Sequence, residues 1–120
     1  MKNKNIFQSF KNAFLGLYYI YLTHKHFKIE ILIGILTIIY FTFLKISYLE
    51  FLIVILTIFF VLFSEILNTA IEEICNLISQ QYHEKIRIIK DMSGALVLLS
   101  VILSLLLFIF LNLKYLFRIL

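Results

Sequence analysis

The 120-residue sequence contains no proline and only three glycines. So few turn-forming residues argue against collagen-like, linker-rich and hairpin-rich architectures. The single cysteine, Cys75, excludes an intramolecular disulfide and fits no metal-binding cysteine spacing. Charged residues are also scarce, at 15% of the chain, whereas apolar residues reach 62%. A chain this short cannot bury so much apolar surface in a soluble core, so the sequence predicts a single membrane-embedded domain over residues 1–120.

Three apolar stretches approach the ~20 residues that a helix needs to cross the hydrocarbon of a bilayer. Transmembrane helices are therefore expected at about 29–47, 50–78 and 90–115. The third has no charge between Met92 and Leu113, whereas the first two contain Lys45 and Glu65. No stretch alternates apolar and polar residues with period two, which argues against a β-barrel. The predicted fold class is all-α and integral to the membrane.

An amphipathic helix is expected before the first span, over about residues 6–26. Its apolar residues recur at spacings of three and four: Ile6, Phe10, Phe14, Leu17 and Tyr21. Lys2, Lys4 and Lys11 would face the lipid phosphates. This pattern is typical of a helix that lies in the membrane interface.

The distribution of lysine and arginine predicts the orientation. Eight of the eleven lie before the first span or between the second and third, and three lie on the other side. The positive-inside rule then puts the N-terminus and the 79–91 segment in the cytoplasm. The expected location is the cell membrane. The net charge of +4 is accordingly attributed to orientation and contact with anionic headgroups, and nucleic acid is not an expected partner.

The second span carries an unusual polar stripe near its cytoplasmic end. At 100° per residue, one helical face collects Glu65, Asn68, Thr69, Glu72 and Asn76. Ionisable groups at membrane depth are costly, and they usually face protein or water and serve a function. The alternative is that Glu72 and Glu73 only mark the solvated end of the span. That alternative suits Glu73, but it explains Glu65 less well because Glu65 sits among apolar residues.

A second polar cluster lies in the connection before the third span: Gln81, Tyr82, His83, Glu84, Lys90 and Asp91. Next to a carboxylate stripe, such a cluster can hold Mg²⁺ and polyphosphate, because Mg²⁺ prefers one or two carboxylates plus phosphate oxygens. An ordinary headgroup-facing turn is the alternative, and the spacing does not exclude it. The sequence has no Walker A loop, protein-kinase glycine loop or G-x-S-x-G motif.

The run from Glu65 to Glu72 (EILNTAIE), followed by Tyr82-His83 and Lys90-Asp91, resembles the signature of the small prokaryotic diacylglycerol kinases. The resemblance covers about residues 9–108. The stretches 9–11 and 45–50 are most similar to the undecaprenol-kinase branch of that family. The resemblance implies an enzyme of lipid metabolism that uses ATP and Mg²⁺ to phosphorylate a membrane lipid alcohol, undecaprenol ahead of diacylglycerol. It also implies a homotrimer with sites between subunits.

The resemblance also implies roles for single residues. Glu65 would be the general base that takes the proton of the lipid hydroxyl, and Asn68 would support it. Glu72 would bind the Mg²⁺ that accompanies ATP. The expected nucleotide contacts are Gln81, Tyr82, His83, Lys90 and Asp91. Gly94 would lie beside the lipid substrate together with Glu65.

Two positions depart from the family pattern. His24 stands where the family has a second metal-binding glutamate, and imidazole suits Mg²⁺ less well than carboxylate does. Either His24 touches the metal or it is an ordinary interfacial residue, as His26 would also be. Glu30 lies six residues further on, 240° round a regular helix, and is therefore not expected to substitute for it. Asn76 stands where many relatives have aspartate.

Two other classes of function compete with the kinase. A small proton-coupled transporter could use Glu65 as its proton site, but it gives no role to Tyr82-His83 or Lys90-Asp91. A pore-forming peptide of the holin type would need none of the polar residues. Burial of the Glu65 stripe needs neighbouring helices, and this independently favours an oligomer.

Overall fold

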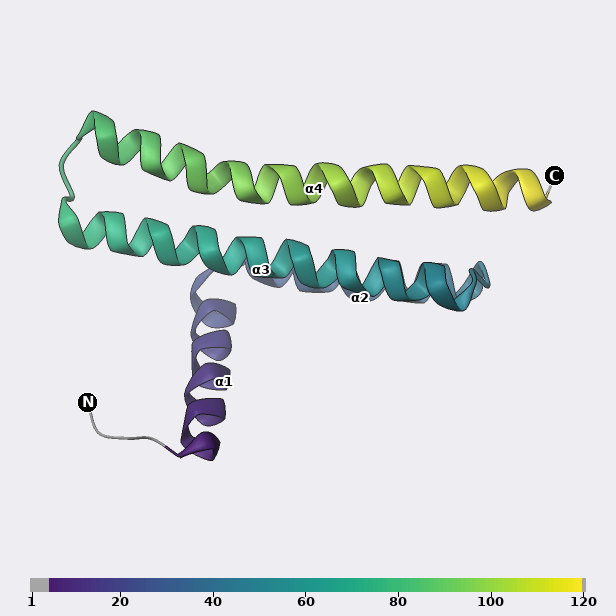
Figure 1. Cartoon of the computed structure of the whole chain (residues 1–120), viewed down its shortest axis with the longest axis horizontal. Helices are drawn as coiled ribbons and strands as arrows, with labels where there is room; N and C mark the ends of the chain where they lie inside the picture. The colour runs from purple at the N-terminus through teal and green to yellow at the C-terminus, as the bar shows by residue number, and fades with distance from the viewer. Residues whose placement is uncertain (1–4, 120) are drawn as a thin grey trace.

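The computed structural model describes residues 5–119, and within them the chain forms four α-helices. They are α1 (Ile6–Thr23), α2 (Lys25–Phe43), α3 (Tyr48–Ile78) and α4 (Glu84–Ile119). Helices α3 and α4 form a long antiparallel hairpin, α2 lies along α3, and α1 runs crosswise away from the other three (Figure 1). Lys2 and Lys4 lie outside the described residues.

Helices α2, α3 and α4 are each long and apolar enough to cross a membrane. The predicted all-α, membrane-integral fold class is confirmed. The 31 residues of α3 extend for about 46 Å, and the hydrocarbon core of a bilayer is ~30 Å thick. At least one end of α3 must therefore project beyond the hydrocarbon.

Local polar groups set the helix boundaries. The backbone N–H of Gln8 donates to Asn5 Oδ1 at 2.8 Å and caps α1. A capping box joins Ser47 and Glu50 at the start of α3. His24 interrupts the helical path between α1 and α2 because its backbone is extended, with φ −121° and ψ 108°. This break lets α1 leave the bundle at the angle seen in Figure 1.

The buried core is small and lies near the α2–α3 turn. It is built from Phe41, Val54, Leu111 and Tyr115. Most large apolar side chains of the three long helices remain exposed, among them Phe59, Leu98 and Phe110. An apolar surface of this extent suits contact with lipid or with other helices.

Small hydroxyl residues hold α3 against α4. The Ser64 and Ser100 Oγ atoms are 2.8 Å apart, and both residues are buried. Each Oγ also lies 2.8 Å from a carbonyl oxygen of its own helix, that of Val61 or Val97. Such residues let helices approach closely in a medium where apolar burial gives little driving force. Their contact fixes the register that brings the polar stripe of α3 to face α4.

Candidate active site

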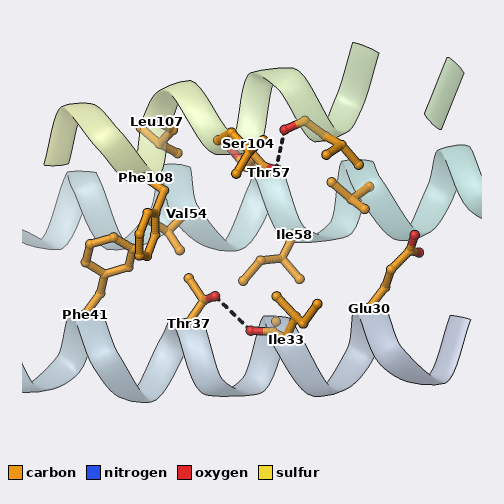
Figure 2. A pocket seen from close by; sticks show the side chains of 14 residues that line it. Glu30, Ile33, Thr37, Phe41, Val54, Thr57, Ile58, Ser104, Leu107 and Phe108 are labelled. Carbon is orange, nitrogen blue, oxygen red and sulfur yellow. Dashed lines mark hydrogen bonds between the residues drawn. The ribbon is translucent and has the colours of Figure 1, made fainter. Parts of the chain in front are cut away.

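Glu65 lies buried on α3, and its carboxyl group meets that of Glu30 from α2. Glu65 is 7% exposed, and the two carboxyl groups are within hydrogen-bonding reach of each other. Figure 2 shows the Glu30 side chain extending from α2 toward α3. Glu30 Oε2 is buried and has no hydrogen-bond partner among the described residues. These two residues, here called the carboxyl pair, form the innermost polar group of the stripe.

Sequence reasoning missed this role of Glu30. The 240° estimate assumed one regular helix from His24 onward, but the chain is extended at His24 and a new helix begins at Lys25. Glu30 therefore belongs to α2, which packs along α3, and it faces Glu65. A charged residue early in an apolar span is the signal that could have pointed to it.

Asn68 is the next member of the stripe, and α4 holds it in place. The buried Ser93 Oγ donates to Asn68 Oδ1 at 2.8 Å and also lies 2.9 Å from the Lys90 carbonyl oxygen. Sequence reasoning did not select Ser93. Gly94, its neighbour, is partly exposed, and a Cβ atom there would meet nothing within 4 Å. The described residues thus leave open space beside Gly94.

Lys90 and Asn76 connect the outer part of the stripe to α4. Lys90 Nζ donates to Asn76 Oδ1 at 2.7 Å. Asp91 is instead held by its own helix, where Arg87 Nη1 donates to its Oδ2 at 2.9 Å. The two members of the Lys90-Asp91 motif therefore differ, because Lys90 faces α3 and Asp91 pairs along α4.

A cavity of about 300 Å³ lies at the α3–α4 connection. We call this cavity the connection pocket. All five predicted nucleotide contacts line it: Gln81, Tyr82, His83, Lys90 and Asp91. Asn76 and Arg87 also line it. Lys85 N–H donates to His83 Nδ1 at 3.2 Å at the start of α4. The pocket is polar and positively charged at one wall, as a phosphate-bearing ligand requires.

The two predicted metal ligands, Glu72 and His24, lie in different surroundings. Glu72 is half-buried on the stripe, between Asn68 and Asn76. His24 lies by Glu73, with Nε2 4.0 Å from the Glu73 carboxylate, and its Nδ1 is 2.8 Å from Thr23 Oγ1. Residues 5–119 contain no group of three histidine, cysteine or acidic side chains that could hold a metal ion. Glu72 alone still fits Mg²⁺ if a ligand supplies phosphate oxygens, because Mg²⁺ commonly binds one or two carboxylates in that way.

The polar groups thus form one line along the α3–α4 hairpin. It begins at the carboxyl pair, continues through Asn68 and Glu72, and ends at Asn76 beside the connection pocket. From Glu65 to Asn76 the line extends for about 16 Å along α3. This geometry separates a buried acidic end from an open, basic end.

A family model described as prokaryotic diacylglycerol kinase matches residues 11–111. The chain belongs to the prokaryotic diacylglycerol kinase family. A diacylglycerol kinase from Synechocystis sp. is 32% identical over 99 residues. That match covers 82% of this chain and 57% of the relative, so the chain spans a little over half of the relative's length.

The range that matches the prokaryotic diacylglycerol kinase model, residues 11–111, includes the whole polar line and the connection pocket. The predicted family resemblance is confirmed. Neither the family nor the relative supports the alternative of a proton-coupled transporter.

Proposed function

We propose that the protein is an ATP-dependent lipid kinase that transfers the γ-phosphate of ATP to a membrane alcohol at the cytoplasmic face. Undecaprenol is the favoured substrate and diacylglycerol the next. The observation that carries the proposal is the polar line, with buried carboxyl groups at one end and a basic pocket at the other. A phosphoryl transfer between a lipid and a water-soluble nucleotide needs these two environments within one site.

The positions of the acidic residues along α3 support a site with one end in the hydrocarbon and the other end in water. Glu50, at the opposite end of α3, lies about 22 Å along the helix from Glu65 and about 33 Å from Glu72. If Glu50 marks one edge of a hydrocarbon layer ~30 Å thick, Glu65 lies inside the layer and Glu72 at its other edge. A lipid hydroxyl can then reach Glu65, while Glu72 and the connection pocket meet water and nucleotide.

In the proposed reaction, the lipid hydroxyl first donates its one hydrogen bond to Glu30, which orients it as the lipid binds. The same proton then passes to Glu65 as the hydroxyl oxygen attacks the γ-phosphorus, the bond from that phosphorus to the β-phosphate oxygen breaks, and ADP leaves. Asn68, fixed by Ser93, keeps the polar edge of α3 in position. Positioning and charge neutralisation account for most phosphoryl-transfer catalysis, so a compact set of residues suffices.

We propose that the connection pocket binds the nucleotide. Lys90 would neutralise phosphate charge, with Gln81, Tyr82, His83 and Asp91 as further contacts. Glu72 would hold Mg²⁺ together with phosphate oxygens, and Mg²⁺ would supply charge neutralisation when bound. His24 is the other predicted metal ligand, and its position beside Glu73 favours Glu72 over it.

The assembly and orientation are also proposals. The exposed apolar faces of α3 and α4 support a homotrimer, in which neighbouring subunits cover the stripe. The lysine and arginine bias supports a cytoplasmic N-terminus and a cell-membrane location. The crosswise path of α1, with only Ile20 buried, supports a helix lying in the membrane interface.

The test is transfer of labelled γ-phosphate from ATP to undecaprenol or diacylglycerol in detergent with Mg²⁺. We expect phosphorylation of both, with undecaprenol preferred. Lys90→Met should raise the KM for ATP about 10- to 150-fold, in line with the 1.5–3 kcal/mol typical of a hydrogen bond to a charged group. Lys85→Met is the matched control, since Lys85 is exposed on the same helix and lies outside the connection pocket.

Absence of labelled lipid with either alcohol, from protein that keeps its helical content, would contradict the kinase proposal. An equal rise in KM in the two lysine variants would contradict the assigned nucleotide pocket. Turnover of diacylglycerol alone would reverse the proposed order of substrates.

A further inference from the structure

Ser93 on α4 is a buried hydroxyl residue that contacts the polar line, and it is only 3% exposed. Its Oγ lies 2.8 Å from Asn68 Oδ1 and 2.9 Å from the carbonyl oxygen of Lys90. Both neighbours are acceptors, whereas the hydroxyl has a single proton. That proton can be donated fully to only one of the two oxygens, and the choice decides what Asn68 offers to a ligand.

The helical backbone of α4 decides between the two acceptors. Lys90 lies inside α4, so its carbonyl oxygen accepts from the backbone N–H of Gly94, four residues further on. Asn68 Oδ1 has no hydrogen-bond donor other than Ser93 among the described residues. Polar groups removed from water are generally hydrogen-bonded, so the proton goes to the oxygen that otherwise lacks a donor. Ser93 therefore donates to Asn68 Oδ1.

This bond fixes the direction of the Asn68 amide. An asparagine amide has an accepting oxygen at one end and two donating hydrogens at the other. With Oδ1 held against α4 by Ser93, Nδ2 keeps both hydrogens for a ligand, because within residues 5–119 it donates to no other group. Glu65 lies three residues before Asn68 and Glu72 four residues after it, so the amide lies between their carboxyl groups on one helical face. A donor between the proposed base and the proposed Mg²⁺ ligand lies where the γ-phosphate would be transferred.

Ser100 makes the same kind of contact away from the polar line. It lies seven residues after Ser93, two turns along the same face of α4, and is fully buried. Its Oγ likewise lies 2.8 Å from a carbonyl oxygen of its own helix and 2.8 Å from a side chain of α3, which is the hydroxyl of Ser64. The two serines share their burial and their backbone contact, and they differ in the α3 group that they meet. Ser100 is therefore the matched control for a role of Ser93 beyond helix packing.

We propose that Ser93 is a positioning residue for phosphoryl transfer. Its hydroxyl proton holds Asn68 Oδ1, and Asn68 Nδ2 then donates to an oxygen of the γ-phosphoryl group as charge moves during the transfer. Without Ser93 the amide can turn over and present its oxygen, which repels the phosphoryl oxygens. This proposal rests on the proposed function, and it adds a residue that acts on the reaction through Asn68 without touching substrate.

The test compares kcat and KM in Ser93→Ala and Ser100→Ala, measured as transfer of labelled γ-phosphate from ATP to undecaprenol or diacylglycerol in detergent with Mg²⁺. Ser93→Ala should lower kcat about three- to tenfold, as expected for loss of one neutral hydrogen bond that acts in the transition state. The KM for ATP and for lipid should change less than about twofold. Ser100→Ala should keep its kcat within about twofold, while its thermal unfolding temperature should fall at least as much as that of Ser93→Ala.

A double-mutant cycle separates an effect through Asn68 from a loosened hairpin. Ser93→Ala should lower kcat in the otherwise unchanged protein and have no further effect in the Asn68→Ala background. Ser93→Cys keeps a weak donor at the same position, and its kcat should lie between those of the serine and alanine proteins. Circular dichroism confirms that each variant is folded at the assay temperature. If Ser93→Ala does not fold, Ser93→Cys replaces it in the cycle with the same expected direction.

Equal losses of kcat in Ser93→Ala and Ser100→Ala would overturn the proposal, since both would then report the packing of α3 against α4. An unchanged kcat in Ser93→Ala, or the same fold-loss in both backgrounds of the cycle, would overturn it as well. These results leave the kinase proposal intact, because the unchanged protein still transfers phosphate. Absence of phosphate transfer by the unchanged protein would instead contradict the kinase proposal and the positioning role together.

Discussion

The open end and the middle of the α3–α4 hairpin both contain acidic side chains with little exposure, but the surroundings of these side chains differ. At the α2–α3 turn, Glu50 accepts from Lys114 Nζ at 3.0 Å, from the Tyr115 hydroxyl and from Ser47 N–H at 3.1 Å. In the middle of α3, about 22 Å from Glu50, the carboxyl groups of Glu65 and Glu30 face each other, and Glu30 Oε2 has no partner among the described residues. One acid is fully bonded, and the other two are left with capacity to bind.

The contrast separates a structural acid from a reactive one. A carboxylate such as that of Glu50, whose oxygens already accept hydrogen bonds from the protein, stabilises the turn and has no free acceptor for a ligand. A buried carboxyl with an open acceptor costs stability, and such groups at membrane depth usually serve a function. Substitutions of Glu50 and of the carboxyl pair should accordingly affect different measured quantities.

The largest expected effect is on turnover in Glu65→Gln. Loss of a general base typically lowers a rate about 10²- to 10⁴-fold, and the amide cannot take the hydroxyl proton. Thermal unfolding in detergent, followed by circular dichroism, should stay close to that of the unchanged protein. Glu73→Gln is the matched control on the exposed side of α3 and should keep its turnover. A Glu65→Gln variant with undiminished phosphate transfer would remove the proposed base.

Glu30→Gln should lower kcat/KM for the lipid about five- to 150-fold, as expected for loss of one hydrogen-bonding acceptor worth ~1–3 kcal/mol. Its stability should be unchanged or slightly higher, because the new amide can donate to Glu65. Steady-state kinetics at varied lipid concentration, together with thermal unfolding, measure both quantities. A strongly destabilised variant would show that Glu30 belongs with Glu50 as a structural acid.

Glu50→Ala should show the reverse behaviour, with a loss of about 1–3 kcal/mol in the free energy of unfolding. It removes the capping box and leaves Lys114 and the Tyr115 hydroxyl without their acceptor. Turnover measured below the unfolding temperature should be retained. Glu84→Ala, an exposed acid in the first turn of α4, is the control for stability. Loss of turnover in a folded Glu50→Ala protein would contradict the distinction between Glu50 and the carboxyl pair.

The smallest effect is expected for Asn76→Asp, which replaces the amide oxygen that accepts from Lys90 with a carboxylate oxygen. Exposed ion pairs contribute about 0–1 kcal/mol, so a carboxylate in place of the Lys90 acceptor should change the KM for ATP less than about fivefold. Titration of initial rates with ATP at two salt concentrations measures the change. A much larger rise in KM would mean that Lys90 must be released from position 76 before it can bind phosphate.

The sequence predicted the helices well because the signal is strong. Long Ile-, Leu- and Phe-rich runs can only be helical in a bilayer, where every backbone polar group must be satisfied within the segment. The stripe of Glu65, Asn68 and Glu72 followed from helical spacing. Its facing partners on α4 did not, because Ser93 and the Lys90–Asn76 contact depend on the register of the hairpin.

The position of Glu30 beside Glu65 could not be predicted from helical spacing in the sequence. The assumption of one regular helix from His24 onward was wrong, since the extended backbone at His24 changes the direction of the helix after it. The apolar cavity between α2, α3 and α4 could not be predicted either. It depends on how three helices lie together, and its apolar residues look like ordinary lipid-facing ones when the sequence is read alone.

The sequence by itself determined that this chain lives in a membrane, that three of its helices can cross it, and that it belongs to the prokaryotic diacylglycerol kinase family. Composition and short motifs are local properties of the sequence, so they can be recognised before any tertiary contact is known. Only the tertiary structure decided that Glu30 faces Glu65, that Glu50 is fully bonded, and that an apolar cavity between α2, α3 and α4 begins at Glu30. These depend on the hydrogen bonds that each buried group finds, and residues distant in sequence supply them.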